Sequence, residues 1–273
     1  MDGMKKIAVV TGASSGMGAD FARQIPFCVD VDEIWLLARR VSKLESVCED
    51  VNHSCAQAGI KTVARFFEID LSGRPGAAAF RELLLKNGFA ENQMELKVLV
   101  NNAGFGTYGT FEDTPVEKEL DMIDLNCTSL TGICGFALEF MGEGSLLINT
   151  ASLASFLPLG NFAVYGASKA FVLSLTMALA AEWKEKGIKV CALCPGPVST
   201  EFANVASNGA RPQVRHGLSS EAVVKHCLKC SLKGKKIAIY APKWKFKAFA
   251  SRFVGRFAGA WFTYKYCKRP CNH

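Results

Sequence analysis

The chain has 273 residues, of which 49% are hydrophobic and 21% charged, a composition that can bury one large core and excludes an intrinsically disordered protein. Its eleven cysteines and four histidines follow neither a disulfide framework nor the spacing of a metal site, so we expect free thiols, no metal and a cytoplasmic location. The net charge of +7 comes from residues 222–273, which carry 13 Lys or Arg and no Asp or Glu; we expect this segment to be solvated or to meet an anionic surface, and expect no nucleic acid.

Short apolar runs alternate with helical patterns along the chain. The first run ends at Thr11-Gly12 and is too short for a signal peptide, so secretion is not expected. The alternation predicts an α/β fold with a doubly wound parallel sheet of seven strands in three α/β/α layers, as a single domain at residues 1–242 with an extension at 243–273. The predicted strands are 7–11, 33–38, 61–68, 97–100, 145–150, 188–194 and 236–240, and the predicted helices are 16–25, 42–57, 76–87, 115–140, 163–186 and 219–231.

The first predicted strand runs directly into the glycine-rich segment Thr11-Gly-Ala-Ser-Ser-Gly-Met-Gly18. Gly12 permits a tight turn, Gly16 lets the backbone approach a pyrophosphate, and Gly18 allows the next helix to pack closely on the strand. Because a strand precedes this segment and a helix follows it, the pattern predicts a dinucleotide site rather than a simple turn. The segment also brings three further residues to that site, which are Ser14, Ser15 and Met17.

The second predicted strand ends in Leu37-Ala-Arg-Arg40, where an NAD-binding chain would carry an acidic residue for the ribose 2′-hydroxyl. A guanidinium at this place can pair with a 2′-phosphate and stack on adenine. Arg39, with Arg40 beside it, therefore favours NADP(H) over NAD(H), and Ser14 or Ser15 would supply further phosphate contacts. The alternative is that the two arginines are only part of the surface.

Tyr165 and Lys169 are four residues apart, which stacks a phenol beside an ammonium on one face of a helix. A phenol with a pKa of about 10 is protonated at neutral pH, and a neighbouring cation lowers that pKa toward usable acid and base chemistry. The same spacing is common on solvated helices, so its meaning depends on the other motifs.

The motifs together resemble those of the short-chain dehydrogenase/reductase family, in its core-only type. The resemblance covers roughly residues 5–240 and implies a Rossmann-type fold and an oxidoreductase that exchanges hydride between a nicotinamide and a carbonyl or alcohol carbon. Besides the glycine segment, it is carried by Asp70-Leu71, Asn101-Asn-Ala-Gly104, Asn126, Ser152, Tyr165-x-x-x-Lys169, Pro195-Gly196 and Thr200.

The resemblance implies three sets of cofactor contacts. A pair of residues after the third strand would contact the adenine, the Asn-Asn-Ala-Gly turn would lie along the adenosine ribose, and the Pro-Gly-Pro loop would wrap the nicotinamide. In that loop a backbone group and a hydroxyl would meet the carboxamide. The residues implied are Asp70, Leu71, Asn101, Ala103, Gly104, Pro195, Gly196, Val198 and Thr200.

A catalytic set of four residues is implied in the same way. Tyr165 would exchange a proton with the substrate oxygen, and Ser152 would hydrogen-bond that oxygen. Lys169 would hold the ribose hydroxyls of the cofactor and lower the pKa of Tyr165, while Asn126 would anchor a water that relays protons toward solvent. The alternative is a non-catalytic NADP-binding regulatory protein on the same fold, which typically lacks the Tyr, Lys or Ser that this chain retains.

The expected substrate pocket is mostly apolar. Such walls suit a lipophilic ketone or secondary alcohol, of the hydroxysteroid, bile acid or 3-oxoacyl type, better than a sugar. Alternatively, several of these residues belong simply to the core. The lining residues expected are Phe105, Leu153, Phe156, Phe162 and Phe202.

The extension at 243–273 is aromatic and basic together. On a single helix, its large apolar residues would share one stripe with cations on either side. This stripe would form a pocket lid or a subunit contact, which we favour, or a peripheral contact with a membrane. The family resemblance also implies a homodimer or homotetramer. The stripe consists of Phe246, Phe249, Phe253, Phe257, Ala260 and Tyr264.

Overall fold

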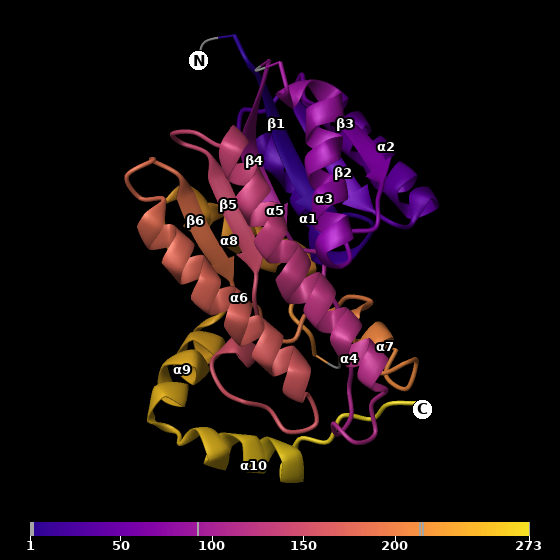
Figure 1. The fold of residues 1–273 in the computed structure, drawn as a ribbon, viewed down its shortest axis with the longest axis vertical. Helices are drawn as coiled ribbons and strands as arrows, with labels where there is room; N and C mark the ends of the chain where they lie inside the picture. The colour runs from indigo at the N-terminus through magenta and orange to yellow at the C-terminus, as the bar shows by residue number, and fades with distance from the viewer. Residues whose placement is uncertain (1–2, 92, 213, 215, 273) are drawn as a thin grey trace.

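A parallel sheet of seven strands lies at the centre of the computed structural model, which describes residues 3–91, 93–212, 214 and 216–272. The strand order is β3-β2-β1-β4-β5-β6-β7, so the winding direction reverses between β1 and β4 (Figure 1). The predicted doubly wound sheet is therefore confirmed. The strands are β1 Lys5–Thr11, β2 Glu33–Ala38, β3 Val63–Glu68, β4 Met94–Asn101, β5 Leu146–Thr150, β6 Lys189–Leu193 and β7 Ile237–Ala238.

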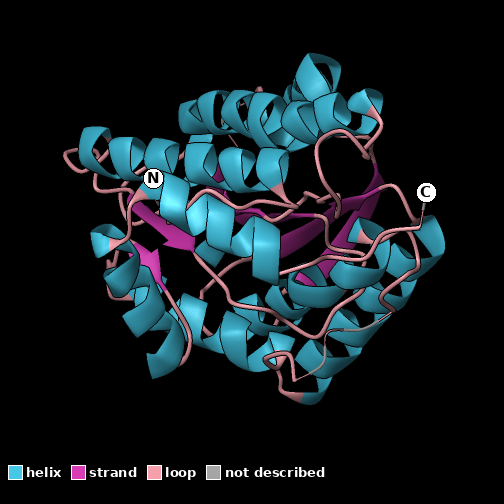
Figure 2. Ribbon diagram, turned by 90° about the horizontal axis from the view of Figure 1, so that it is seen from below, coloured by secondary structure: helices cyan, strands magenta, loops and turns pink. Residues whose placement is uncertain are grey.

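Helices cover both faces of the sheet, as Figure 2 shows. Successive side chains of a strand point to opposite faces, so Ala8 and Val10 of β1 join one core cluster while Ile7 and Val9 join the other. Strands buried on both faces read as continuous apolar runs, which is why the sequence predicts them well. One face carries α1 Gly16–Gln24, α2 Val41–Gln57 and α8 Ser220–Leu232, and the other carries α3 Gly73–Leu84, α5 Leu130–Ala137 and α6 Ala163–Glu182.

Length and hydropathy alone would let α6 cross a membrane, and it is the one helix of the described residues for which this holds. Its inner side is instead buried: Val172 and Ala180 belong to the core cluster on one face of the sheet. The same helix carries Tyr165 and Lys169, both buried. We therefore regard α6 as a core helix of the sheet.

The long helix predicted at 115–140 is interrupted. It consists of α4 Val116–Ile123, a π-helical turn at Asp124–Ser129, α5, and a 3₁₀ turn at Leu138–Phe140. A π-turn widens the helix by one residue and is frequent at functional sites. Hydrophobic periodicity does not reveal such a turn, because the apolar spacing before and after it remains helical.

The extension forms two helices, α9 Pro242–Ala250 and α10 Arg256–Tyr266, joined through a 3₁₀ turn at Ser251–Phe253. Val254 and Gly255 both have extended backbone angles, with ψ of 125° and 135°. The single helical stripe predicted for this segment is therefore wrong. Both helices lie beyond the carboxyl ends of the strands, where Figure 1 shows them in yellow.

The edge strand β7 has only two residues, although a strand at 236–240 was expected. It pairs on one side only, through Ala192 with Ile237 and Leu193 with Ala238. A short helix, α7 Phe202–Ala206, follows β6 and was not expected. Both differences lie near the carboxyl edge of the sheet, where the C-terminal segments pack.

Candidate active site

Tyr165, Lys169, Ser152 and Asn126 come from three different parts of the chain and meet at the carboxyl ends of β4 and β5. Ser152 lies near enough to Tyr165 to lower the pKa of its phenol, and the Lys169 Nζ lies 5.8 Å from the centre of the Tyr165 ring. A Cβ placed on Gly104 would lie 2.7 Å from Asn126 Oδ1 and 3.4 Å from Lys169 Nζ. The structure thus brings together the four residues predicted to be catalytic.

Ser152 is held by a capping box at the start of a 3₁₀ turn, Leu153–Ser155. Its Oγ accepts from the Ala154 amide at 3.1 Å, while Ser155 Oγ accepts from the Ser152 amide at 3.3 Å. Ser155 also donates to the Lys169 carbonyl at 2.7 Å. The loop after β5 is therefore fastened to α6, which fixes Ser152 relative to Tyr165.

Tyr165 is a buried phenol, only 8% exposed. Burial raises its pKa to about 12, and the nearby Ser152 side chain offsets only part of this effect. The expected lowering of the Tyr165 pKa by Lys169 is not seen here, because desolvation of the phenolate outweighs the nearby charges. Tyr165 is therefore fully protonated at neutral pH and is suited to donate a proton.

Lys169 is buried and donates from Nζ to the Thr150 carbonyl at 2.8 Å. Burial lowers the pKa of Lys169 from 10.5 to about 8. The ammonium is thus held by a backbone oxygen at the end of β5, beside Gly104 and close to the face of the Tyr165 ring.

The lowered pKa of Lys169 predicts how stability depends on pH. Between about pH 8 and 10.5 the unfolded chain binds a proton at Lys169 that the folded protein has released, so this group makes folding more favourable as pH rises. Relative to Lys169→Met, the cofactor-free wild type should gain about 2 kcal/mol of unfolding free energy between pH 7 and pH 9.5. Urea unfolding of both proteins at the two pH values measures this difference, and a constant difference would contradict the assignment.

Asn126 lies in the π-turn and is almost fully buried. Its Nδ2 donates to the Phe105 carbonyl at 2.9 Å and to Ser168 Oγ at 3.1 Å, and its Oδ1 accepts from the Phe105 amide at 3.2 Å. The side chain thereby joins the loop after β4 to α6. The widened turn is what directs this amide inward.

The glycine segment packs so closely on neighbouring parts of the chain that added side chains would collide with them. A Cβ on Gly18 would lie 2.1 Å from the Gly12 carbonyl oxygen, and one on Gly12 would lie 2.9 Å from the Cα of Ala103. Gly16 has a φ of +52°, and a Cβ there would lie 3.0 Å from Thr200 Cγ2. Side chains at Gly12 and Gly18 would collide with the protein's own backbone, so this segment stays bare at the carboxyl edge of β1, where the dinucleotide site is expected.

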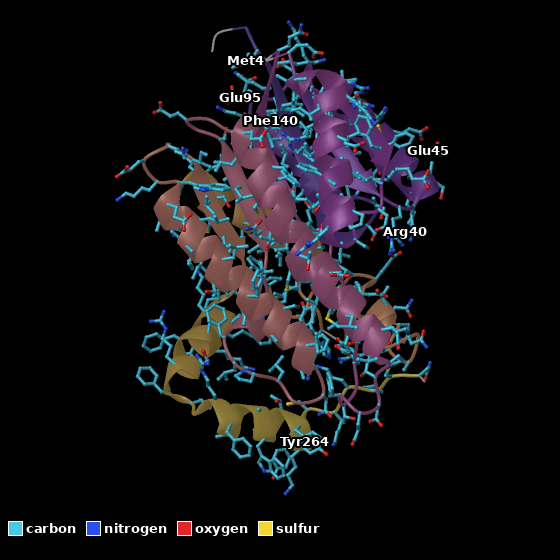
Figure 3. The ribbon with its side chains drawn as sticks, in the orientation of Figure 1. Met4, Arg40, Glu45, Glu95, Phe140 and Tyr264 are labelled. Atoms are coloured by element: carbon cyan, nitrogen blue, oxygen red, sulfur yellow. The ribbon has the colours of Figure 1, made fainter. Side chains whose placement is uncertain are left out.

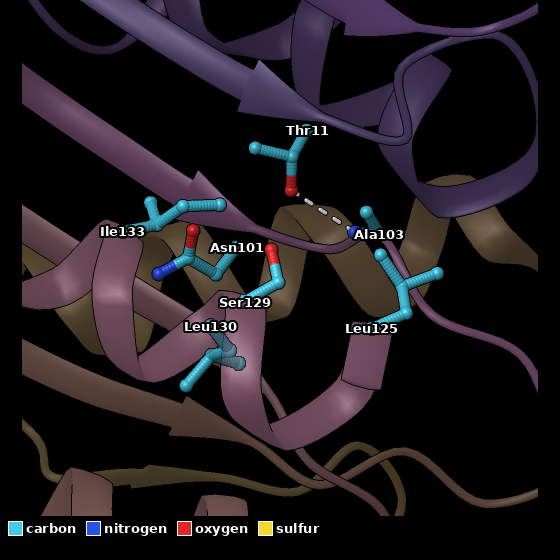
Figure 4. A pocket seen from close by; sticks show the side chains of 7 residues that line it. All are labelled: Thr11, Asn101, Ala103, Leu125, Ser129, Leu130 and Ile133. Atoms are coloured by element: carbon cyan, nitrogen blue, oxygen red, sulfur yellow. Dashed lines mark hydrogen bonds between the residues drawn. The ribbon is translucent and has the colours of Figure 1, made fainter. Parts of the chain in front are cut away.

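Thr11 ties this segment to the Asn-Asn-Ala-Gly turn. Its Oγ1 accepts from the Asn102 amide at 3.0 Å and from the Ala103 amide at 3.0 Å, the second of which Figure 4 shows. The Asn101 side chain, in contrast, points into the core and donates to Asn149 Oδ1 at 2.9 Å. Figure 4 shows it beside Ser129 at a small internal cavity. The ribose contact expected here can therefore not come from the Asn101 side chain.

Arg40, rather than Arg39, faces the glycine segment. Its Nη2 donates to Ser15 Oγ at 2.7 Å and to Ser14 Oγ at 3.0 Å, at the edge of the sheet where Figure 3 labels it. The Arg39 side chain is 70% exposed and lies 3.9 Å from the Asp70 carboxylate. The sequence predicts the phosphate contact from Arg39, whereas the structure places Arg40 on the two serines, because the Arg39 side chain is directed outward to Asp70.

Glu201 is a charged residue at this edge that the sequence did not single out. Its carboxylate accepts from Arg40 Nη1 at 2.8 Å and pairs with Lys43. These hydrogen bonds, that from Lys43 above all, lower the pKa of Glu201 to about 2. Glu201 therefore links the loop after β6 to the start of α2.

Asp70 and Leu71, the two residues expected to contact the adenine, differ in exposure. Asp70 is exposed and accepts from the Ser72 amide and hydroxyl at 3.0 and 2.8 Å, which lowers the pKa of Asp70. The Leu71 side chain is buried in the core cluster that includes Phe80. Any adenine contact from Leu71 would have to come from its backbone.

The Pro-Gly-Pro loop follows β6 and is fixed from two sides. The Pro195 carbonyl accepts from the Leu153 amide at 3.0 Å, and Val198 forms a parallel bridge with Leu218. A Cβ on Gly196 would lie 2.7 Å from the indole of Trp244 in α9. The first helix of the extension therefore packs on the loop that is expected to wrap the nicotinamide.

Aromatic side chains pack around Tyr165. Phe162 stacks on it with ring centres 4.1 Å apart, and Phe202 lies at 5.4 Å. Phe105 packs against the same apolar cluster, which also contains Tyr108. Phe156 packs instead against the core cluster on the face of the sheet that carries α6. Leu153 is half-buried in the capping turn.

A C-terminal strap, residues 267–272, closes this region. Arg269 donates to the Gly160 carbonyl at 3.3 Å and lies 4.8 Å over the Phe162 ring. Asn272 and Asn208 each donate to the carbonyl of the other, at 3.1 and 2.9 Å. The strap thus joins the loop before α6 to the loop after α7.

Comparisons with known proteins agree with this geometry. A family model described as short chain dehydrogenase matches residues 6–210. An uncharacterized oxidoreductase of Staphylococcus epidermidis is 28% identical over 222 residues, covering 81% of this chain and 90% of that protein. Among solved structures, a short-chain dehydrogenase from Sphingobium yanoikuyae in complex with NADPH superposes with a TM-score of 0.73 at 24% identity, covering 92% and 94% of the two chains. A Burkholderia phymatum protein in complex with NAD gives 0.75 at 21% identity, covering 91% and 93%.

Proposed function

The chain belongs to the short-chain dehydrogenase/reductase family and is an oxidoreductase, and we propose that it uses NADPH to reduce a lipophilic ketone to a secondary alcohol. The observation that carries this proposal is the placement of Tyr165, which is buried near Ser152 with Lys169 one helical turn away. A phenol with its pKa raised to about 12 holds its proton until a developing alkoxide, itself strongly basic, takes it.

Tyr165 and Ser152 would both act on the carbonyl oxygen of the substrate ketone. Tyr165 gives it a proton, and the Ser152 hydroxyl, held by the capping box, donates a hydrogen bond that stabilises its developing charge. A bound nicotinamide supplies the hydride at the carbonyl carbon. Lys169 would bind the ribose hydroxyls next to Gly104, and its positive charge would favour transient ionisation of Tyr165. Asn126 keeps the loop after β4 and α6 at a fixed separation.

The choice of NADP(H) rests on Arg40 and the two serines of the glycine segment. The Arg40 guanidinium and the hydroxyls of Ser14 and Ser15 already converge within hydrogen-bonding distance. Together they match a 2′-phosphate, which takes charge-assisted hydrogen bonds from Arg and neutral ones from Ser. No acidic residue stands at 39 or 40 to bind a free 2′-hydroxyl.

Arg40→Ala tests the cofactor preference. The loss of charge-assisted hydrogen bonds should weaken NADPH binding by about 10- to 100-fold and leave NADH binding nearly unchanged. Arg39→Ala is the matched control, because its guanidinium is exposed and should change NADPH affinity much less. Fluorescence titration of both variants with both cofactors gives the comparison. An equal loss for NADPH and NADH in Arg40→Ala would assign Arg40 a structural role.

The apolar surroundings of Tyr165 support a lipophilic substrate, of the hydroxysteroid, bile acid or 3-oxoacyl type. Phe162, Phe202 and Phe105 surround the tyrosine, and such walls suit a lipophilic ketone better than a strongly hydrated sugar. NADPH consumption with a panel of steroid ketones, acyl thioesters and sugars tests this class. Turnover of sugars alone would reject it, and no turnover with any carbonyl would favour the non-catalytic alternative.

A further inference from the structure

The two C-terminal helices present an unusual number of exposed aromatic side chains. Phe253 and Phe257 are 77% and 79% exposed, although a phenylalanine is normally buried. Figure 3 shows the side chains around Tyr264 pointing away from the ribbon. We call this set the C-terminal aromatic surface; it consists of Phe246, Phe249, Phe253, Phe257, Trp261, Phe262 and Tyr266.

These aromatic residues are not available to the core, because other residues anchor the two helices. Trp244 packs on Gly196, and Ala248 is buried. In α10, Gly259 lies on Leu157, and Thr263 accepts from the Gly160 amide at 2.9 Å. The sides of α9 and α10 that face the protein are thus already occupied by these contacts, and the aromatic residues lie on the outer sides.

Basic residues are interspersed with the aromatic residues in this part of the sequence, and Lys265 lies over the Tyr266 ring. No Asp or Glu occurs in residues 222–273. Aromatic rings with long basic side chains beside them suit the boundary of a lipid bilayer, where rings enter the acyl region and cations meet the headgroups. The basic residues on and beside the two helices are Lys243, Lys245, Lys247, Arg252, Arg256, Lys265 and Lys268.

A second copy of the chain is a poorer partner for this surface. Two such surfaces brought together would oppose like charges with no acidic residue of residues 222–273 to pair them. A second copy could bind instead to other exposed apolar side chains, which are Leu120 and Ile123 of α4 and Phe171 of α6. The charge of the C-terminal aromatic surface instead complements an anionic lipid surface.

We propose that the C-terminal aromatic surface docks the protein peripherally on an anionic membrane. The aromatic side chains insert at the headgroup boundary, and the lysines and arginines bind acidic headgroups. Docking places the Gly160 loop, which α10 contacts through Thr263, near the bilayer. If the proposed function is correct, a lipophilic substrate then reaches Tyr165 from the membrane, past Phe162.

Vesicle flotation of the full chain tests the docking without any substrate. The wild type should float with vesicles of phosphatidylcholine containing 30% phosphatidylglycerol, but not with phosphatidylcholine alone, and high salt should release it. The double variant Phe253→Ser and Phe257→Ser should bind the anionic vesicles at least 10-fold more weakly. The matched control replaces Phe27 and Phe111, 51% and 62% exposed on other surfaces, by Ser and should bind like the wild type.

Three results would overturn the proposal. The wild type could fail to float with anionic vesicles at low salt, or both double variants could bind equally well. The Phe253 and Phe257 variant could also lose an oligomeric state, seen by light scattering, with unchanged vesicle binding, which would assign the surface to a second copy. Thermal unfolding confirms that both variants fold. Because flotation needs no turnover, its outcome is independent of the proposed ketone reduction.

Discussion

Replacing Tyr165 by Phe should lower kcat for ketone reduction by about 10²- to 10⁴-fold. The change removes only the phenolic proton donor: the ring that stacks on Phe162 at 4.1 Å is kept. NADPH affinity should stay within about threefold, since Lys169 and the glycine segment are untouched. Steady-state NADPH oxidation gives kcat, and fluorescence titration gives the cofactor affinity.

Tyr240→Phe is the matched control for this experiment. Tyr240 lies beside His226 in the core on the opposite face of the sheet, so loss of its hydroxyl should leave turnover unchanged. The assignment of Tyr165 as proton donor would be wrong if Tyr165→Phe turned over like the wild type. A variant that failed to bind NADPH would show instead that the hydroxyl is needed to build the site.

Replacing Gly18 by Ala should have the largest effect on the cofactor site. The added Cβ would lie 2.1 Å from the Gly12 carbonyl oxygen and 2.7 Å from Asn102 Nδ2, so α1 has to move away from β1. Overpacking against backbone costs about 3 kcal/mol or more. NADPH affinity should fall about 100-fold if the whole cost appears in binding. Urea unfolding and fluorescence titration show how the cost divides between folding and binding.

Gly135→Ala is the control with the same chemical change. Gly135 lies inside α5, and a Cβ there would meet nothing within 4 Å. Alanine has the higher helix propensity, so this variant should be stabilised by about 0.5–1 kcal/mol with unchanged NADPH binding. Similar destabilisation of the two variants would contradict the close contact that we assign to Gly18.

Much of the fold could be predicted because both faces of the sheet are buried. The apolar runs of β1, β2 and β5 are continuous, and helices with an apolar side separate them, so pattern alone predicts parallel β-α units. The glycine segment is also local: its three glycines, the strand before and the helix after it are adjacent in sequence. The part of the site made by local geometry was therefore accessible from the sequence.

The remaining features depend on contacts between distant segments. Arg39 and Arg40 are neighbours, and only the packing of α2 determines that Arg40 meets Ser14 and Ser15. Burial, which no spacing reveals, raises the pKa of Tyr165 rather than lowering it. The strap contact of Arg269 with Gly160 spans 109 residues. Neither the two contacts nor the raised pKa follows from a local sequence pattern.

The helix break at residues 254 and 255 could not be predicted from the sequence pattern either. A helical wheel places Phe253 and Phe257 on one stripe, yet the extended backbone between them separates them into two elements. Gly255 lowers helix propensity by only about 1 kcal/mol, which is too little to decide the outcome alone. Packing of Gly259 on Leu157 and of Trp244 on Gly196 fixes each helix separately.

The contact between Trp244 and Gly196 makes the fluorescence of this tryptophan sensitive to the position of the Pro-Gly-Pro loop after β6. The indole lies against Gly196, and its Nε1 is buried without a hydrogen-bond partner among the described residues. A shift of that loop changes the surroundings of the indole and hence its emission. Trp35 and Trp183 are buried elsewhere, and Trp261 is exposed on α10. A version that keeps only Trp244 can therefore follow loop movement by fluorescence, with no attached dye.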